Sequence, residues 1–165
     1  MFNKKDKYNI VIVGATGIVG ESLLDILKTR NFPYDNVFAV ASERSAGASV
    51  KFGKDLLEVS DIKKFDFGNI DFAFFSAGSS VSKEYAPKAA SQGAIVIDNT
   101  SEFRYVDDIP LIVPEVNPED IKLYKNRNII ANPNCSTIQM LVALKPIHDL
   151  FKIKRITVST YQAVS

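Results

Sequence analysis

The sequence predicts an α/β fold of the Rossmann type, in which a doubly wound, mainly parallel sheet carries helices on both faces. Three observations support this fold class. Short apolar runs alternate with amphipathic segments between residues 8 and 131, a glycine-rich turn follows the first run, and polar clusters follow several later runs. Strands that alternate with helices favour a parallel sheet, because parallel neighbours need a crossover connection. Residues 134–165 leave this alternation and are expected to begin a second, α+β domain.

The apolar runs and the spacing of apolar residues place the individual elements. The predicted strands span residues 8–13, 36–41, 70–75, 95–98, 111–113, 128–131 and 153–163, with one or two more across 49–60. The predicted helices, where apolar residues recur three and four apart, span 18–28, 80–92 and 136–144. Asn117 is expected to cap a further helix with Pro118 at its first position, and Pro146 is expected to kink or end the last helix.

Composition limits the classes of protein. The 165 residues are 46% hydrophobic and 24% charged, which is typical of a globular domain with its own core. The net charge of +1 gives no broad electrostatic case for nucleic acid or an anionic membrane, and the apolar runs are too short to span a bilayer. The single cysteine excludes an intrachain disulfide, and the polar N-terminus lacks a signal-peptide pattern. We therefore expect a cytoplasmic protein with no nucleic-acid, membrane or metal partner.

The glycine-rich turn has the spacing G-x-x-G-x-x-G and lies between the first strand and the first helix. It contains Gly14, Thr16, Gly17, Ile18, Val19 and Gly20. In dinucleotide-binding turns the first glycine permits the tight turn, the second lets a pyrophosphate approach the backbone, and the third permits close packing of the helix. A turn that only packs tightly is the alternative, but the strand–turn–helix context favours a nucleotide site.

The segment after the second strand favours NADP as the cofactor. Ser42, Arg44 and Ser45 offer hydroxyl and guanidinium donors to a 2′-phosphate. Glu43 is a contrary signal, because an acidic residue at this position binds the ribose 2′-hydroxyl in NAD enzymes. A solvated loop cation is the other interpretation of Arg44.

Two more polar turns follow strands and are expected at the same edge of the sheet. Ser76 and Gly78 would let the chain approach the cofactor, although a tight turn with Ser79 as a helix cap explains the same residues almost as well. In residues 98–104, Arg104 could bind a phosphate or carboxylate, or could pair on the surface with Asp107 or Asp108. The spacing alone leaves both interpretations of Arg104 open.

Cys135 follows a strand and opens an apolar helix, where backbone N–H groups and the helix dipole stabilise negative charge. A buried structural cysteine is the commoner fate of a free thiol, but the nucleotide signals upstream favour a nucleophile. The only histidine, His148, lies thirteen residues further along the same helix. At 1.5 Å per residue that separation is about 20 Å, so His148 is not a candidate base for Cys135.

Together these residues resemble the aspartate-semialdehyde dehydrogenase family over essentially the whole chain. The matching segments are residues 13–20, 42–47, 98–104, 113–117, 132–137 and 160–165. The resemblance implies reductive dephosphorylation of L-aspartyl 4-phosphate to the semialdehyde, with NADP as cofactor and phosphate as product. This reaction lies on the route to lysine, threonine and methionine. Alternatives are an N-acetylglutamyl-phosphate reductase and a nucleotide-binding module without catalysis.

The resemblance also implies residue roles. Cys135 would form the acyl-thioester, Arg104 with Asn134 would hold the phosphate, and Gln162 would contact the substrate. NADP would be bound by Thr16, Gly17, Ile18, Val19, Arg44, Ser45 and Ser165. Residues 1–133 would be the NADP-binding domain, and 134–165 the start of a truncated catalytic and dimerisation domain. The acid/base histidine would lie beyond Ser165, so we expect little turnover from these residues alone. The full-length protein would be a homodimer or homotetramer.

Overall fold

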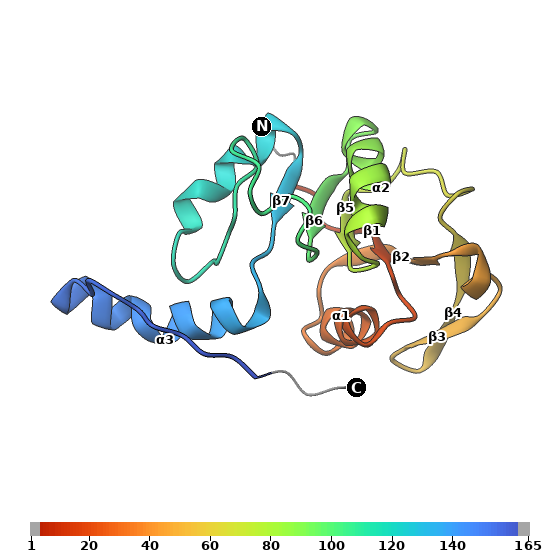
Figure 1. Ribbon diagram of the computed structural model, residues 1–165. Helices are drawn as coiled ribbons and strands as arrows, with labels where there is room; N and C mark the ends of the chain where they lie inside the picture. The colour runs from red at the N-terminus through yellow and green to blue at the C-terminus, as the bar shows by residue number, and fades with distance from the viewer. Residues whose placement is uncertain (1–3, 162–165) are drawn as a thin grey trace.

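The computed structural model describes residues 4–161 and contains one seven-stranded sheet flanked by helices (Figure 1). The strands are β1 (Tyr8–Val13), β2 (Tyr34–Ala41), β3 (Ser49–Phe52), β4 (Asp55–Asp61), β5 (Phe72–Phe75), β6 (Ile95–Asp98) and β7 (Ile129–Ala131). The α-helices are α1 (Ile18–Thr29), α2 (Ser79–Ser91) and α3 (Cys135–Phe151), and the 3₁₀ segments are η1 (Glu43–Ser45) and η2 (Pro118–Asn126).

The strand order is β3-β4-β2-β1-β5-β6-β7, with β1 in the centre. β1 pairs in parallel with both β2 and β5, and only the edge strand β3 pairs antiparallel within the described part of the sheet. The chain builds the sheet outward in one direction from β1 to β4 and in the other from β5 to β7. The doubly wound, mainly parallel fold predicted from the sequence is therefore confirmed, and the change of direction lies between β1 and β5.

The two faces of the sheet have separate hydrophobic cores, each covered by one helix. Alternate residues of β1 belong to opposite cores, as the pleat of a strand requires. Ile12 packs with Leu24 of α1 on one face, and Val11 packs with Ala86 of α2 on the other. All four side chains are fully buried. This arrangement confirms the prediction of helices on both faces.

The strand predicted at residues 111–113 is reduced to an isolated bridge. Leu111 pairs in parallel with Ala131, and Ile112 N donates to the carbonyl of Ala131 at 3.0 Å. Pro110 and Pro114 flank the segment, and prolines have no N–H to extend a ladder. The helix predicted after Asn117 is the 3₁₀ segment η2 with Pro118 first, but the Asn117 side chain does not cap it. Its Oδ1 instead accepts from Val113 N at 2.9 Å.

The last helix does not end near Pro146 but continues to Phe151. Proline removes one intrahelical hydrogen bond, and the carbonyl it leaves belongs to Val142. Val142 is exposed, and α3 contributes no buried residue in the described structure, so water can reach the freed carbonyl. Figure 1 shows α3 extending away from the sheet.

The strand predicted at 153–163 is wrong for the residues that the structure describes. Residues 152–161 have no helix or strand assignment, and residues 162 and 163 lie outside the described range. The segment instead runs back beside α3 (Figure 1). Ile153 and Ile156 line a cleft there with Leu141. An alternating sequence becomes a strand only where another strand offers hydrogen-bond partners, and none of the seven strands lies beside this segment. No helix within residues 4–161 has the length and apolar character needed to cross a membrane.

Candidate active site

A cleft of about 300 Å³ opens at the carboxyl ends of β1, β2 and β5. This is the point where the sheet changes its winding direction. Ligands of open α/β sheets bind at such a switch point, because the loops after the two strands diverge and leave a crevice. The predicted site residues that line the cleft are Gly14, Thr16, Gly17, Ser42, Ser45 and Ser76. Of the others, Ile18 and Val19 begin α1 directly after the first turn, Arg44 lies in η1, and Gly78 is the N-cap of α2.

The three glycines of the first turn differ in what surrounds them. Gly14 has a φ of +92°, and a Cβ there would lie 2.9 Å from the backbone N of Ala77. A Cβ on Gly20 would lie 2.2 Å from the carbonyl oxygen of Gly14, because α1 packs directly on the turn. A Cβ on Gly17 would meet nothing closer than that same oxygen at 3.5 Å, among the described residues. The fold thus requires glycine at 14 and 20, whereas Gly17 borders open space that fits a pyrophosphate.

The N-terminus of α1 presents backbone N–H groups to this space. Gly17 is the N-cap and has no side chain to satisfy them. The first intrahelical bond runs from Glu21 N to Gly17 O at 2.9 Å, so the N–H groups of Ile18 and Val19 have no partner within the helix. The helix dipole adds a partial positive charge, and the combination attracts phosphate. The residues present therefore fit the dinucleotide that the sequence predicted.

In the turn after β2, the side chain of Glu43 is paired with a lysine, whereas that of Arg44 is unpaired among the described residues. Arg44 is exposed and makes no hydrogen bond or ion pair with the described residues. The carboxylate Oε2 of Glu43 lies 3.0 Å from Nζ of Lys63, as a hydrogen bond and an ion pair. The hydrogen bond to Glu43 is the main cause that raises the pKa of Lys63. The acidic side chain that argued against a 2′-phosphate is thus paired with a lysine from another turn.

The turn after β5 is hydrogen-bonded to the last residue of β1, directly before the glycine-rich turn. Ser76 donates its backbone N–H and its hydroxyl to the carbonyl of Val13, at 2.9 and 3.2 Å. Gly78 has a φ of +94°, a conformation that a side chain would strain. Gly78, and not Ser79, is the N-cap of α2, so Ser79 is not the helix cap that was considered. The Ser79 hydroxyl instead lies 3.0 Å from that of Ser101.

A buried carboxylate fixes the turn after β6. Asp98 and Ser82 are both fully buried, and the Ser82 hydroxyl donates to Oδ1 of Asp98 at 2.7 Å. Thr100 donates its hydroxyl to Oδ2 at 2.8 Å and its backbone N–H to Oδ1 at 3.3 Å. A buried charge is tolerated only when hydrogen bonds replace its water, and these three do so. Asp98 therefore sets the backbone path of the residues that lead to Arg104.

Arg104 is held between the turns after β6 and β7. Its Nε donates to the carbonyl of Asn132 at 3.0 Å, and its Nη2 donates to the carbonyl of Asn99 at 3.1 Å. Among the described residues Arg104 makes no ion pair with Asp107 or Asp108, and Asp108 instead accepts from Nε of Arg127 at 2.7 Å. A guanidinium has five N–H donors, so three remain for an anion.

Cys135 is exposed at the first position of α3, directly after the turn that Arg104 contacts. Among the described residues, Cys135 is therefore not a buried structural thiol. The N-cap is Asn134, whose Oδ1 accepts from Ser136 N at 2.9 Å and so fixes the start of the helix. The turn before it is tied to β6 by Asn132, which donates its N–H to the carbonyl of Asp98 at 2.8 Å. The chain thus places a fixed arginine and an exposed thiol on neighbouring turns.

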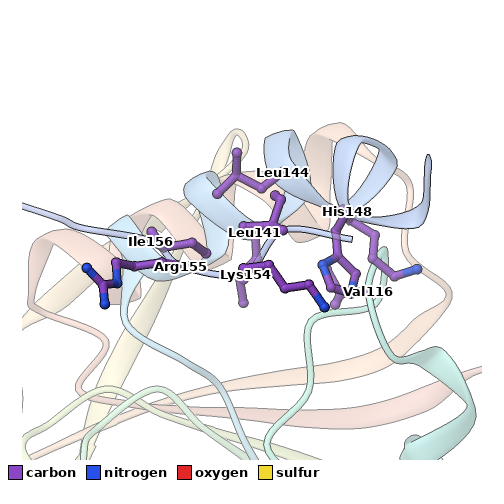
Figure 2. A pocket seen from close by; sticks show the side chains of 9 residues that line it. Val116, Leu141, Leu144, His148, Lys154, Arg155 and Ile156 are labelled. Atoms are coloured by element: carbon purple, nitrogen blue, oxygen red, sulfur yellow. The ribbon is translucent and has the colours of Figure 1, made fainter. Parts of the chain in front are cut away.

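His148 lies away from this arrangement. It is exposed near the C-terminal end of α3 and lines a second cleft of about 370 Å³ with Leu144 and Lys154 (Figure 2). Cys135 and His148 belong to one continuous helix, which supports the predicted separation of about 20 Å. Gln162 and Ser165 lie outside the described residues.

Three contacts at the site were not anticipated from the sequence. They are the Lys63–Glu43 pair, the buried Ser82–Asp98 bond, and a bond of 2.6 Å from Asn132 Nδ2 to Asn99 Oδ1. Only Ser82 has a signal in the sequence, as a serine on the alanine-rich face of a predicted helix. The other two join residues twenty or more positions apart and depend on which strands become neighbours.

Most of this chain matches a known protein family. The family model described as semialdehyde dehydrogenase, NAD binding domain, matches residues 9–124. The chain belongs to this family. Aspartate-semialdehyde dehydrogenase of Shewanella violacea is 57% identical over 159 residues, which are 96% of this chain and 47% of that protein. This semialdehyde dehydrogenase segment thus spans about half the length of the curated relatives it matches, and the resemblance seen in the sequence is confirmed.

Solved structures of relatives have the same fold. Aspartate semialdehyde dehydrogenase II of Vibrio cholerae, complexed with ASA, is 57% identical with a TM-score of 0.84, over 87% of this chain and 47% of that one. Aspartate semialdehyde dehydrogenase of Candida albicans, solved with NADP, is 26% identical with a TM-score of 0.73, over 88% and 48%. These likenesses confirm the Rossmann-like architecture of this family member.

Proposed function

We propose that this chain is the cofactor-binding and nucleophile-bearing part of an NADP-dependent aspartate-semialdehyde dehydrogenase. The reaction is reductive dephosphorylation of L-aspartyl 4-phosphate to L-aspartate 4-semialdehyde, on the route to lysine, threonine and methionine. The observation that carries the proposal is the exposed Cys135 at the start of α3, beside the turn whose carbonyl orients Arg104. The names of the relatives supply the substrate, and the structure with NADP supplies the cofactor.

The chemistry follows from the residue types. The Cys135 thiolate attacks the acyl carbon of aspartyl phosphate, the bond to the phosphate oxygen breaks, and phosphate leaves with the bonding electron pair. Arg104 balances the charge of the departing phosphate, with Asn134 beside it. NADPH, when bound, supplies the hydride that reduces the thioester. The carbonyl then re-forms as the carbon–sulfur bond breaks with its electron pair going to sulfur, which releases the semialdehyde and returns the Cys135 thiolate. Gln162 is proposed to contact the substrate.

Cofactor binding is assigned to the turns at the cleft. The N–H groups of Ile18 and Val19 and the open face of Gly17 receive the pyrophosphate, with Thr16 at the rim. Arg44, Ser42 and Ser45 receive the 2′-phosphate. Gly14 and Ser76, which line the cleft, and Gly78, which follows Ser76 by two residues, are assigned to the same cofactor site, and Ser165 is a further proposed contact.

The organisation of the protein is part of the same proposal. Residues 1–133 form the NADP-binding domain, and residues 134–165 begin a catalytic and dimerisation domain. In support, the chain leaves the sheet after β7, and α3 buries no side chain within the described structure. A homodimer or homotetramer in the cytoplasm is proposed for the full-length protein, where a reducing environment keeps Cys135 free.

Acyl trapping tests the proposal directly. The protein expressed from its complete gene is mixed with aspartyl phosphate without NADPH, and we expect one phosphate released per protein and an aspartyl adduct on Cys135 by mass spectrometry. NADPH added afterwards should release the semialdehyde. Cys135→Ala is the control and should give neither adduct nor phosphate.

Two results would replace this assignment. An adduct formed only from N-acetylglutamyl phosphate would make the protein a reductase of that substrate. Tight NADPH binding with no adduct from either acyl phosphate would make it a nucleotide-binding module without catalysis.

A further inference from the structure

We propose that Lys63 is a specificity-determining residue, which favours NADP over NAD by neutralising the carboxylate of Glu43. The inference rests on the proposed binding of NADP. Its basis is the 3.0 Å contact between Lys63 Nζ and Glu43 Oε2, at the turn that follows β2. Lys63 lies in a different turn, outside every segment that the sequence pointed to.

Glu43 occupies a position where charge decides between the two cofactors. It follows β2 by two residues and precedes Arg44. A free carboxylate there would accept a hydrogen bond from a ribose 2′-hydroxyl and would repel a 2′-phosphate. When the Glu43 carboxylate is paired with a lysine, the pair has little net charge. The positive charge of Arg44 is then not compensated.

The fold brings Lys63 to Glu43 because β2 and β4 are neighbours. Ala41 and Asp61, the last residues of the two strands, are paired in register. Ile62 N then donates to the carbonyl of Ala41 at 2.9 Å, and Lys63 N donates to Oδ1 of Asp61 at 3.0 Å. The backbone of Lys63 is thus anchored at the rim of the cleft that Ile62 lines.

The Lys63–Glu43 pair contributes little to the stability of the fold. Its proposed role is in cofactor selection. The side chains of Lys63 and Glu43 are 63% and 73% exposed, and exposed ion pairs are worth little. The proposed effect is on the local charge beside a bound phosphate. One unit charge a few ångströms from that phosphate, in a water-like medium, changes the dissociation constant by about three- to tenfold.

Five variants separate this mechanism from the alternatives. They are Lys63→Gln, Lys63→Arg, Glu43→Gln, the double variant of Lys63→Gln with Glu43→Gln, and Lys64→Gln as a control that removes an adjacent exposed lysine. Dissociation constants for NADPH and NADH are measured by fluorescence titration of the full-length protein. We expect Lys63→Gln to lower the NADPH/NADH preference about three- to tenfold, and Lys64→Gln to change it less than twofold.

The double variant tests whether Lys63 acts through Glu43. With the carboxylate gone, loss of the lysine should restore the wild-type preference, and Lys63→Arg should also retain it. An unchanged preference in Lys63→Gln, or a loss that persists fully in the double variant, would overturn the inference, the latter because Lys63 would then contact the phosphate itself. Failure of the wild-type protein to bind either nucleotide would overturn the proposed function and this inference with it.

Discussion

The guanidinium of Arg104 donates its Nε hydrogen to the carbonyl oxygen of Asn132 at 3.0 Å, three residues before the exposed thiol of Cys135. A second donor, Nη2, reaches the carbonyl of Asn99 on the neighbouring turn. Two carbonyls in fixed places determine how the planar group lies. The remaining donors are thus held in one orientation, on a group bound to the turn that precedes Cys135.

Replacement of Arg104 by lysine tests this orientation. A single ammonium keeps the charge but cannot bridge both carbonyls in the geometry of the fork. We expect the KM for acyl phosphate to rise about tenfold, equivalent to ~1.4 kcal/mol, with NADPH binding unchanged. The measurement is steady-state kinetics of the full-length enzyme with NADPH titration. Arg127→Lys, at the surface pair with Asp108, is the matched control, and equal losses in both variants would contradict the assignment.

The glycines of the first turn give a paired prediction. Gly17→Ala adds a methyl group in open space, so the thermal midpoint should change little while NADPH affinity falls about tenfold or more. Gly20→Ala places a Cβ 2.2 Å from the carbonyl oxygen of Gly14, and such overpacking should cost about 1–3 kcal/mol. Thermal unfolding and nucleotide titration of the two variants are the measurements. If Gly17→Ala binds NADPH as the wild type does, the pyrophosphate does not approach at this turn.

The buried carboxylate of Asp98 should be expensive to remove. Asp98→Ala leaves the Ser82 and Thr100 hydroxyls without their acceptor, and each lost bond to a charged group is worth about 1.5–3 kcal/mol. We expect Asp98→Ala to be several kcal/mol less stable in urea unfolding, and Ser82→Ala to lose about half as much. Equal stability of Asp98→Ala and wild type would mean that this network does not hold the turn.

Cys135 should react completely in the native protein, because it is exposed and is the only cysteine of the chain. Iodoacetamide should label Cys135 of the full-length protein to the same extent before and after unfolding in urea, as measured by mass spectrometry of the peptide that contains it. Cys135→Ala should bind NADPH normally, since the residue lies outside the cofactor cleft. A native thiol that resists labelling would show that a further part of the full-length protein covers it.

The fold was predictable where neighbours in sequence determine it. Buried strands such as β1 and β6 are short apolar runs, and α1 follows from its apolar spacing, so local pattern and final structure agree. The strand predicted across residues 153–161 is wrong, because an alternating sequence forms a strand only where a partner strand is present. Pro146 was expected to kink or end the last helix, and the helix does not end there, because water can satisfy the carbonyl that the proline leaves free.

The site was predictable as a set of turns but not as a set of contacts. Each turn follows a strand, and a parallel sheet gathers such turns at one edge, which put Gly14, Ser42, Ser76 and Arg104 in one region. The bond between Asn99 and Asn132 depends on β6 and β7 becoming neighbours, which short sequence windows do not encode. The pairing of Lys63 with Glu43 has the same origin in β4 and β2.

The acceptors that hold Arg104 are main-chain oxygens, and a main-chain oxygen is present whatever residue occupies the position. Substitution of Asn99 or Asn132 can therefore change the chemistry around the anion site without releasing the arginine. Substitution at those two positions removes the side-chain bond between them but keeps both acceptors of Arg104, so only substitution of Arg104 itself removes the cation. The side chains around the anion site can therefore change during evolution while the orientation of Arg104 is kept.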